Sequence, residues 1–320
     1  MPSAPAAPSA QDWPIAAAML PFTPSQDAPG EQWASQLAEV AYEGFTAVDV
    51  TDSWVRPGDL SPQRLTELRG ALDATGLKPL TLSAIRRSVI DPVDGAANLA
   101  YSHRTLEAAA ALGVQIVSVG LHRPLLPAQQ AALWFWVQQG PVDSSDDETW
   151  QLAVTRLREL GEHAESLGLQ LSLEMYEDTL LGSPASAVRL LEDIGLDVVG
   201  LNPDLGNLFR LHRQIPPFAE WVETCLPVTN YWHIKSYFRD EDPATGGYVG
   251  IPAPMEIGTI NYRQAIRRAL ELGFTGPFCV EHYGGDGLSV SAQNARYIRR
   301  MLAVATGEAA AEVLAKAGAR

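Results

Sequence analysis

The sequence is poor in cysteine and contains neither a long apolar run nor an excess of basic residues. Cys225 and Cys279 are the only two cysteines among 320 residues, too few for a disulfide framework or a cysteine-rich zinc site. No uninterrupted run reaches the ~18 apolar residues that a membrane span needs. The first residues have neither the basic nor the apolar region of a secretory signal. We therefore expect a cytoplasmic protein without a membrane partner.

The acidic charge balance argues against a nucleic-acid partner. The formal net charge is −15 at pH 7, whereas proteins that bind phosphate backbones need a basic surface. The hydrophobic share of 46% and the charged share of 19% are typical of a globular protein with a large core. A chain of 320 residues can form two ordinary domains or one large βα barrel.

Short apolar runs alternate with longer amphipathic stretches along the chain. This pattern is typical of parallel strands that are buried on both faces and connected by helices. Helical spacing is clearest over Trp150–Leu167 and Tyr262–Leu272. The eight predicted strands are Ile15–Leu20, Ala47–Val50, Leu80–Ser83, Val114–Val119, Leu169–Glu174, Val198–Leu201, Tyr231–Ile234 and Phe278–Glu281.

A glycine recurs between a helix-like stretch and the next apolar run. Glycine accommodates the left-handed conformation that closes a helix, so each such position predicts a helix end followed by a strand. The repeat favours a single-domain (β/α)8 TIM barrel, a form of α/β fold, over an α+β or all-β arrangement. We expect the barrel over 14–305, a disordered leader over 1–13 and a helical extension over 306–320. The glycines are Gly44, Gly76, Gly113, Gly168, Gly195 and Gly273.

Two long loops are predicted, one after the fourth strand and one after the seventh. They cover 121–148 and 237–259, and both leave the C-terminal end of the barrel, where loops of such enzymes cover the substrate. The first contains Trp134, Phe135 and Trp136. These rings form either a hydrophobic plug that packs the loop, an aromatic wall for a sugar or aryl ring, or a subunit contact.

Four predicted strands end in residues that bind hard metals. Because the C-terminal ends of all strands in a βα barrel meet at one mouth, the four side chains should converge there. Three carboxylates and one imidazole suit Mn²⁺ or Mg²⁺. The alternatives are a structural salt bridge for a glutamate, a cap of a following turn for Asp204, and a core histidine bonded to a backbone carbonyl. The predicted ligands are Glu174, Asp204, His233 and Glu281.

These four segments resemble those of the xylose isomerase-like TIM barrels, the sugar phosphate isomerase/epimerase superfamily, over residues 14–305. The resemblance implies a divalent metal at the four residues and a small sugar or glycoside substrate with a carbonyl group. A proton next to that carbonyl leaves, and Glu174 and Glu281 are implied as bases on opposite faces. His122, just after the fourth strand, is an independent candidate base because imidazole exchanges protons near neutral pH. Its alternative role is a hydrogen bond within the loop.

Three features depart from the epimerase pattern. Asn207 stands where those epimerases carry a histidine, three residues after the metal-binding aspartate. Residues 254–258 (Pro-Met-Glu-Ile-Gly) replace an acidic Gly-x-Gly motif. Lys235 and Arg239 add two cations where a substrate oxygen or carboxylate would lie. We predict Asn207, Lys235 and Arg239 as substrate contacts, and the departures argue against simple ketose epimerisation.

Residues 233–237 and 251–258 are similar to the larger subunit of C-glycoside deglycosidases, which cleave the carbon–carbon bond between sugar and aglycone in 3-oxo-C-glycosides. This similarity favours a lyase-type elimination. The alternative is a sugar isomerase, ketose 3-epimerase or inosose dehydratase of the same fold. A small second subunit or a homo-oligomer is the implied protein partner. Two further alternatives belong to other functional classes. An abasic-site endonuclease would need a basic groove and more histidine ligands, whereas this chain has a net charge of −15 and only six histidines. A non-catalytic sugar-binding barrel is the remaining alternative.

Overall fold

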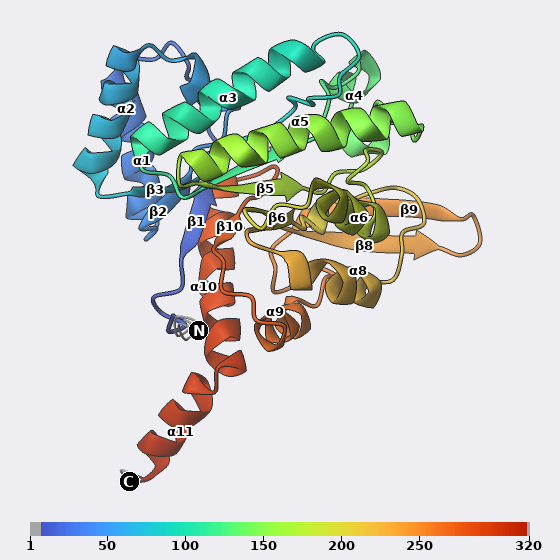
Figure 1. Ribbon diagram of the computed structural model, residues 1–320. Helices are drawn as coiled ribbons and strands as arrows, with labels where there is room; N and C mark the ends of the chain where they lie inside the picture. Colours follow the sequence, from blue (N-terminus) through green and yellow to red (C-terminus); the bar gives the residue numbers. More distant parts are fainter. Residues whose placement is uncertain (1–7, 319–320) are drawn as a thin grey trace.

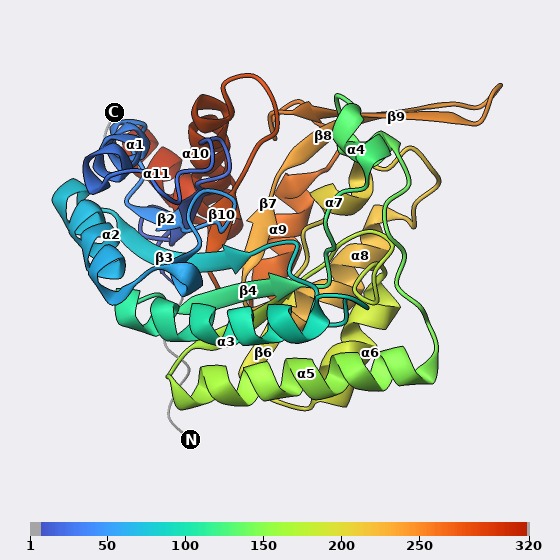
Figure 2. The same ribbon diagram turned by 90° about the horizontal axis from the view of Figure 1, so that it is seen from above.

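The computed structural model describes residues 8–318, and its centre is a barrel of parallel strands surrounded by helices (Figures 1 and 2). Hydrogen-bonded neighbours follow the order β6-β5-β4-β3-β2-β1-β10-β7. A single parallel bridge between Leu201 and Thr229 joins the two ends of this sheet. The predicted (β/α)8 barrel is confirmed. Its strands are β1 Ile15–Ala18, β2 Ala47–Asp49, β3 Lys78–Ala84, β4 Ile116–Gly120, β5 Gln170–Glu174, β6 Val199–Asn202, β7 Trp232–Ile234 and β10 Phe278–Val280.

The helices begin and end where the local sequence favours it. Ser61, Asp146 and Ser183 cap α2, α5 and α6 by accepting a backbone N–H of the first turn. All six glycines between helices and strands are left-handed, with φ from 67° at Gly195 to 92° at Gly44. The helices are α1 Gly30–Tyr42, α2 Pro62–Thr75, α3 Gly95–Leu112, α4 Pro127–Ala131, α5 Asp147–Ser166, α6 Pro184–Ile194, α7 Gly206–Phe209, α8 Phe218–Cys225, α9 Tyr262–Glu271, α10 Gly287–Ala305 and α11 Glu308–Gly318, with 3-10 turns η1 Pro57–Asp59, η2 Phe135–Val137 and η3 Leu226–Val228.

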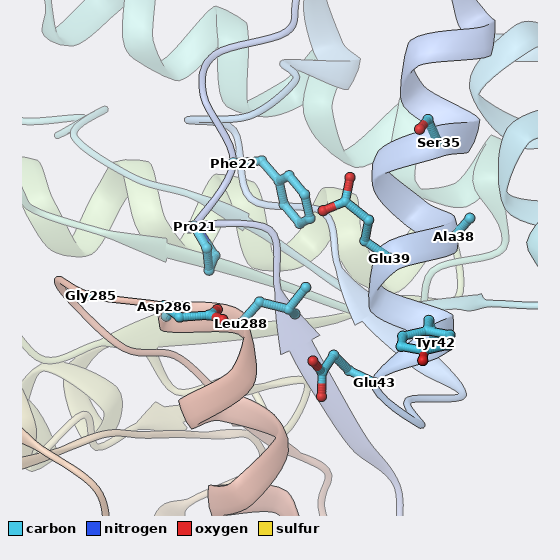
Figure 3. A pocket seen from close by; sticks show the side chains of 11 residues that line it. Pro21, Phe22, Ser35, Ala38, Glu39, Tyr42, Glu43, Gly285, Asp286 and Leu288 are labelled. Atoms are coloured by element: carbon cyan, nitrogen blue, oxygen red, sulfur yellow. The ribbon is translucent and has the colours of Figure 1, made fainter.

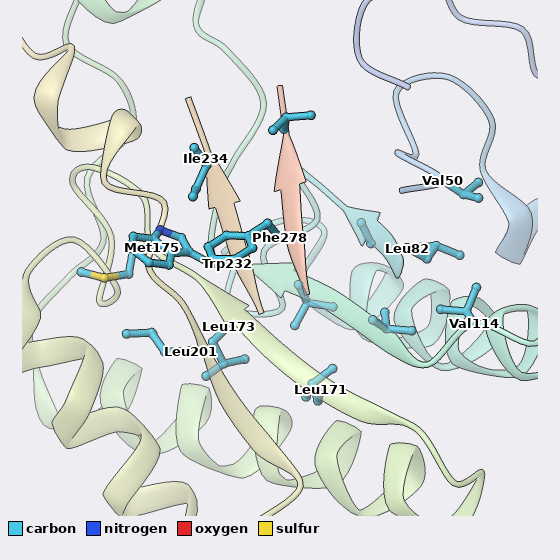
Figure 4. Packing of buried hydrophobic residues seen from close by; sticks show 14 of the residues in the cluster. Val50, Leu82, Val114, Leu171, Leu173, Met175, Leu201, Trp232, Ile234 and Phe278 are labelled. Atoms are coloured by element: carbon cyan, nitrogen blue, oxygen red, sulfur yellow. The ribbon is translucent and has the colours of Figure 1, made fainter. Parts of the chain in front are cut away.

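The two faces of the barrel sheet differ in chemistry. Alternate side chains of a strand point to opposite faces, so each strand contributes to both the outer layer and the interior. The outward set is large and apolar and packs into the main hydrophobic cluster with the helices (Figure 4): Val48, Leu82, Leu171, Leu173, Leu201, Trp232 and Phe278. Apart from Ile116, the buried inward set is small or polar, for example Ala16, Asp49, Thr81, Ser83, Ser118, Ser172, Tyr231 and His233.

The connection after β7 differs from the predicted irregular loop. Residues 236–253 form an antiparallel hairpin of β8 Ser236–Asp242 and β9 Gly247–Ala253, which projects from the barrel (Figure 2). The left-handed Gly246, with φ of 68°, lies at its turn. Because this stretch is rich in Gly, Pro and Asp, the alternation of buried and exposed side chains that is typical of a strand could not be recognised in its sequence. Tyr237 is buried, whereas its neighbour Phe238 is exposed opposite Ile251.

The two ends of the chain correspond to the predicted leader over 1–13 and the predicted helical extension over 306–320. Residues 1–7 of the leader lie outside the described part of the chain. Of the following residues, Trp13 is buried and donates a hydrogen bond to the carbonyl of Gly276 at 3.0 Å. Helix α11 continues beyond α10 and points away from the barrel (Figure 1). Within residues 8–318, no helix is both long and apolar enough to cross a membrane.

Asn230, just before β7, closes the seam of the barrel by extending its side chain past Gly200 of β6 to β5. Its amide donates to the Leu171 carbonyl at 3.0 Å and accepts from the Ser172 hydroxyl at 2.7 Å. Asn230→Ala leaves both partners unsatisfied and should lower the free energy of unfolding by about 1–3 kcal/mol in urea denaturation. Gln170→Ala, at an exposed position on β5, should change it by less than about 0.5 kcal/mol. An equally small change in Asn230→Ala would contradict its role at the seam.

Candidate active site

Three of the four predicted metal ligands converge at the C-terminal mouth of the barrel. Glu174 ends β5, Asp204 follows β6, and His233 lies in β7. One ligand atom of each lies within 4.8 Å of the others, and all three residues are buried. His233 Nδ1 is 3.9 Å from Glu174 Oε2. Since buried carboxylates are unfavourable unless a positive charge balances them, this arrangement predicts a bound cation.

The fourth predicted ligand, Glu281, is paired with Lys235. The Lys235 ammonium contacts carboxylate oxygens of both Glu281 and Asp204, so one cation bridges two candidate ligands. Burial alone lowers the pKa of Lys235, but Asp204 and Glu281 outweigh it and raise this pKa well above its ordinary value. The ammonium therefore stays charged. Sequence reasoning placed Lys235 near the substrate but missed this bridge.

The charges of the cluster fit a divalent cation. Three carboxylates face a single ammonium, which leaves an excess of two negative charges when all are ionised. Burial raises the pKa of Asp204 to about 7, and repulsion from Glu281 and Glu174 adds to this rise while Lys235 opposes it. Asp204 Oδ1 and His233 Nδ1 are buried without a hydrogen-bond partner among residues 8–318. A divalent cation held by these atoms would satisfy both and neutralise the excess charge.

His122 and Asn207 lie around Glu174. His122 Nε2 is 3.6 Å from Glu174 Oε1, and Asn207 Nδ2 donates to the same oxygen at 3.1 Å. Burial alone raises the pKa of Glu174, but His122 and His233 outweigh it and lower this pKa, so the carboxylate stays ionised. One oxygen of Glu174 is thus hydrogen-bonded to Asn207 with His122 beside it, and the other faces His233. Both His122 and Asn207 line the cavity.

Arg239, the third predicted substrate contact, does not line this cavity. Its guanidinium donates to the carbonyl of Phe209 at 3.1 Å and to those of Leu211 and Arg213. The guanidinium also lies over the Tyr248 ring, 4.7 Å from its centroid. Arg239 therefore connects the β8–β9 hairpin to the segment after α7.

A second group of metal-ligating atoms lies deeper in the barrel and is a poorer candidate. It consists of Asp49, His233 and Cys279. The carboxylate of Asp49 already accepts hydrogen bonds from neighbouring hydroxyls, including that of Thr81 at 2.7 Å. Burial raises the pKa of the Cys279 thiol well above its ordinary value, so no thiolate is offered. The mouth cluster is the better metal site.

The aromatic cluster of the first long loop, called the plug and defined here as residues 134–136, packs against Tyr283, one of the residues that line the cavity. Trp136 is buried and donates a hydrogen bond to the Gly250 carbonyl of β9 at 3.2 Å. Its ring meets those of Tyr237 and Tyr283 at 5.5 and 5.6 Å. The cavity measures about 20 Å³, which suffices for one ion or water. A sugar is larger than this volume, so its binding requires residues around the cavity to move.

A buried ion pair supports the plug from below, and sequence reasoning missed it. Arg210 is fully buried and donates to both carboxylate oxygens of Glu177 at 3.0 Å. Its guanidinium also lies 4.7 Å from the ring centroid of Phe135 and 5.2 Å from that of Trp136. The sequence offered one indication of this pair. Glu177 and Arg210 have opposite charges and follow β5 and β6, the two strands that lead to Glu174 and Asp204.

A wider groove lies elsewhere, between α1 and the start of α10 (Figure 3). Pro21, Phe22 and Leu288 supply apolar parts of its wall. Its carboxylates, such as Glu39 and Asp286, are exposed and come from opposite walls (Figure 3). This groove lacks the buried, converging ionisable groups of the mouth, which remains the candidate active site.

Comparison with known proteins agrees with this geometry. A family described as the xylose isomerase-like TIM barrel matches residues 37–303. A solved xylose isomerase-like TIM barrel protein from Mycobacterium smegmatis, in complex with magnesium, is 49% identical with a TM-score of 0.89. The match covers 93% of this chain and 99% of that chain. The chain belongs to the xylose isomerase-like TIM barrel family.

More distant structures share the fold of this xylose isomerase-like barrel. D-allulose 3-epimerase from Methylomonas sp. is 12% identical, with a TM-score of 0.68 over 93% of this chain and 100% of that one. The 3-keto-D-glucoside 4-epimerase of E. coli is 17% identical, with a TM-score of 0.64 over 90% and 100%. No curated protein sequence matches the chain significantly. The narrower resemblance to C-glycoside deglycosidases stays a prediction.

The contact between Gly284 and Trp134 allows the plug to be tested. A Cβ added to Gly284 would lie 2.7 Å from Trp134 Cη2, whereas one added to Gly285 meets nothing within 4 Å. Both glycines are left-handed, so both alanine variants should lose about 1–2 kcal/mol through backbone strain. Only Gly284→Ala should displace the plug and speed limited proteolysis within 121–146. Equal proteolysis of the two variants would show that Trp134 does not seat the plug.

Proposed function

We propose that this xylose isomerase-like barrel is a divalent-metal-dependent sugar isomerase or epimerase that moves a proton next to the carbonyl of an oxo-sugar. The observation that carries the proposal is the buried cluster of Glu174, Asp204 and His233, with its excess negative charge and its unpartnered Asp204 Oδ1 and His233 Nδ1. The magnesium in the M. smegmatis relative and the sugar epimerases among the distant neighbours support it.

The metal site consists of Glu174, Asp204 and His233, with Glu281 as the fourth ligand. When bound, the metal supplies a positive charge that stabilises developing negative charge on a substrate oxygen. Lys235 keeps the carboxylates of Asp204 and Glu281 together and balances part of their charge. Its ammonium also donates a hydrogen bond to a substrate oxygen at the same end of the cavity. Mn²⁺ and Mg²⁺ are the ions that this oxygen-rich set favours.

His122 is the base in this proposal. It lies next to Glu174, and its Nδ1 is buried without a hydrogen-bond partner in the described part of the chain. Glu281 is less available because one of its oxygens is engaged by Lys235. Asn207 holds Glu174 in place and contacts the substrate from the position where epimerases carry histidine. The alternative is that Glu174 and Glu281 move the proton and His122 only orients Glu174.

Elimination from a 3-oxo-C-glycoside begins with the same proton removal, so product analysis must distinguish the two reactions. Three samples of the protein (metal-free, loaded with Mn²⁺ and loaded with Mg²⁺) are each incubated in D2O, once with free ketoses and once with 3-oxo-glycosides. We expect deuterium at the carbon next to the carbonyl, together with an isomeric sugar, only when metal is present. Release of a free aglycone without isomerisation would assign the barrel to lyase chemistry. Absence of deuterium incorporation from every substrate would contradict proton abstraction.

His233→Ala should remove the bound metal and the activity while the barrel stays folded, because the outward apolar layer does not include this side chain. Metal content after dialysis measures the loss, and melting temperature checks the fold. EDTA should have the same effect on the unaltered protein, and Mn²⁺ should restore it. His103→Ala, on the surface of α3, is the control that loses a histidine elsewhere. Full metal occupancy in His233→Ala would contradict the ligand assignment.

His122→Ala should retain metal but lose at least the ~10²-fold in rate that general-base catalysis contributes. The reason is that His122 contacts Glu174 without being one of the converging ligands. Turnover and metal content are measured on the same preparation. A near-normal rate in the metal-loaded variant would assign the proton transfer to Glu174 and Glu281 instead.

A further inference from the structure

The inner nitrogen of His233 contacts a buried hydrogen-bond network that the proposed reaction does not use. His233 Nε2 lies 2.8 Å from the Tyr231 hydroxyl and 3.2 Å from the Ser83 hydroxyl. Both hydroxyls are hydrogen-bonded in turn to one oxygen of Asp49, each at 2.8 Å. Asp49 is fully buried on β2, inside the barrel. Side chains from β2 and β3 and the residue before β7 therefore meet below the metal ligands.

The hydroxyls of Thr81, Ser83 and Tyr231 surround one oxygen of Asp49, and because a carboxylate only accepts, these contacts set the direction of the hydrogen bonds to His233. Ser83 and Tyr231 each have one hydroxyl proton, and each donates it to Asp49. Both hydroxyl oxygens can then only accept from His233. The imidazole must therefore carry its proton on Nε2, which leaves the Nδ1 lone pair for the mouth of the barrel.

We propose that Asp49 is a positioning residue that selects the metal-binding tautomer of His233. Asp49 contacts neither the ring nor the cavity, and it acts through the hydroxyls of Tyr231 and Ser83. A hydrogen bond to the second nitrogen of a ligating histidine fixes both its tautomer and its orientation. This inference rests on the metal site proposed above.

The orientation of the His233 ring agrees with this role. Its backbone N–H donates to Asn202 Oδ1 at 2.8 Å, which ties β7 to β6 at the level of the site. The Tyr231 ring meets the imidazole edge to face at 4.9 Å between centroids. The ring is thereby held on the inner side, and Nδ1 faces Glu174.

Asp49→Asn tests the proposal with little change in shape. An amide nitrogen at this position donates a hydrogen bond, so a hydroxyl that faced the carboxylate must turn its proton elsewhere. Tyr231 or Ser83 can then donate to Nε2, which places the ring proton on Nδ1 and blocks the metal. We expect the Kd for Mn²⁺, measured by calorimetry on the full chain, to rise by about 10- to 100-fold.

Asp52→Asn is the matched control. Asp52 is also buried, lies just after β2, and accepts the Ile85 backbone N–H at 3.0 Å. It takes no part in the His233 network, so its substitution should change the Kd by less than about threefold, well below the expected effect of losing the network. A comparable loss of affinity in both variants would overturn the proposal, because the effect would then come from general loosening of the β2 end.

Nitrogen NMR of the imidazole in the unaltered, metal-free protein at alkaline pH provides a test that needs no variant. The neutral His233 ring should show a protonated Nε2 and an unprotonated Nδ1, and Asp49→Asn should reverse or mix these signals. A ring protonated on Nδ1 in the unaltered protein would overturn the inference, even if metal binds. By contrast, failure of the unaltered protein to bind any divalent ion would overturn the proposed function, while the observed tautomer still decides the role of Asp49.

Discussion

Three carboxylates and one ammonium are buried together at the mouth of the barrel, and the rest of the site is arranged around this charge imbalance. Lys235 compensates one of the negative charges of Glu174, Asp204 and Glu281 and contacts two of these groups. His233 adds an imidazole nitrogen to the carboxylate oxygens of the cluster. Such a cluster is unfavourable as a structural feature alone, because each desolvated carboxylate lacks a full counter-charge. A divalent cation removes this cost.

The division of the sheet into two faces connects folding to chemistry. The outward layer supplies the apolar burial that holds strands and helices together, and it contains no ligand (Figure 4). The inward layer is free to carry hydroxyls and Asp49, because the outer layer already stabilises the barrel. Its hydrogen bonds then orient His233 from below, while Trp136 of the plug and Arg210 pack against Tyr283, which lines the cavity.

The sequence contained enough to predict the barrel, the approximate positions of its strands and the convergence of Glu174, Asp204 and His233, since apolar periodicity and glycine positions report local structure directly. Contacts between distant charged residues were not predictable in the same way. Lys235 and Arg239 lie four residues apart, yet one enters the cavity and the other binds carbonyls outside it. Such differences depend on the course of the segments that connect strands and helices. The β8–β9 hairpin, which was expected to be a loop, shows that amino-acid composition alone does not predict this course.

The central claim is that the mouth cluster holds a divalent cation through Glu174, Asp204 and His233 Nδ1. Anomalous diffraction from crystals of the full chain grown with Mn²⁺ tests it most directly. The account predicts one strong peak within bonding distance of these three groups, with Nε2 of His233 still hydrogen-bonded to Tyr231. A mouth without a peak, in which Lys235 alone bridges the carboxylates, would contradict it, as would a peak on the Asp49–Cys279 side of the ring.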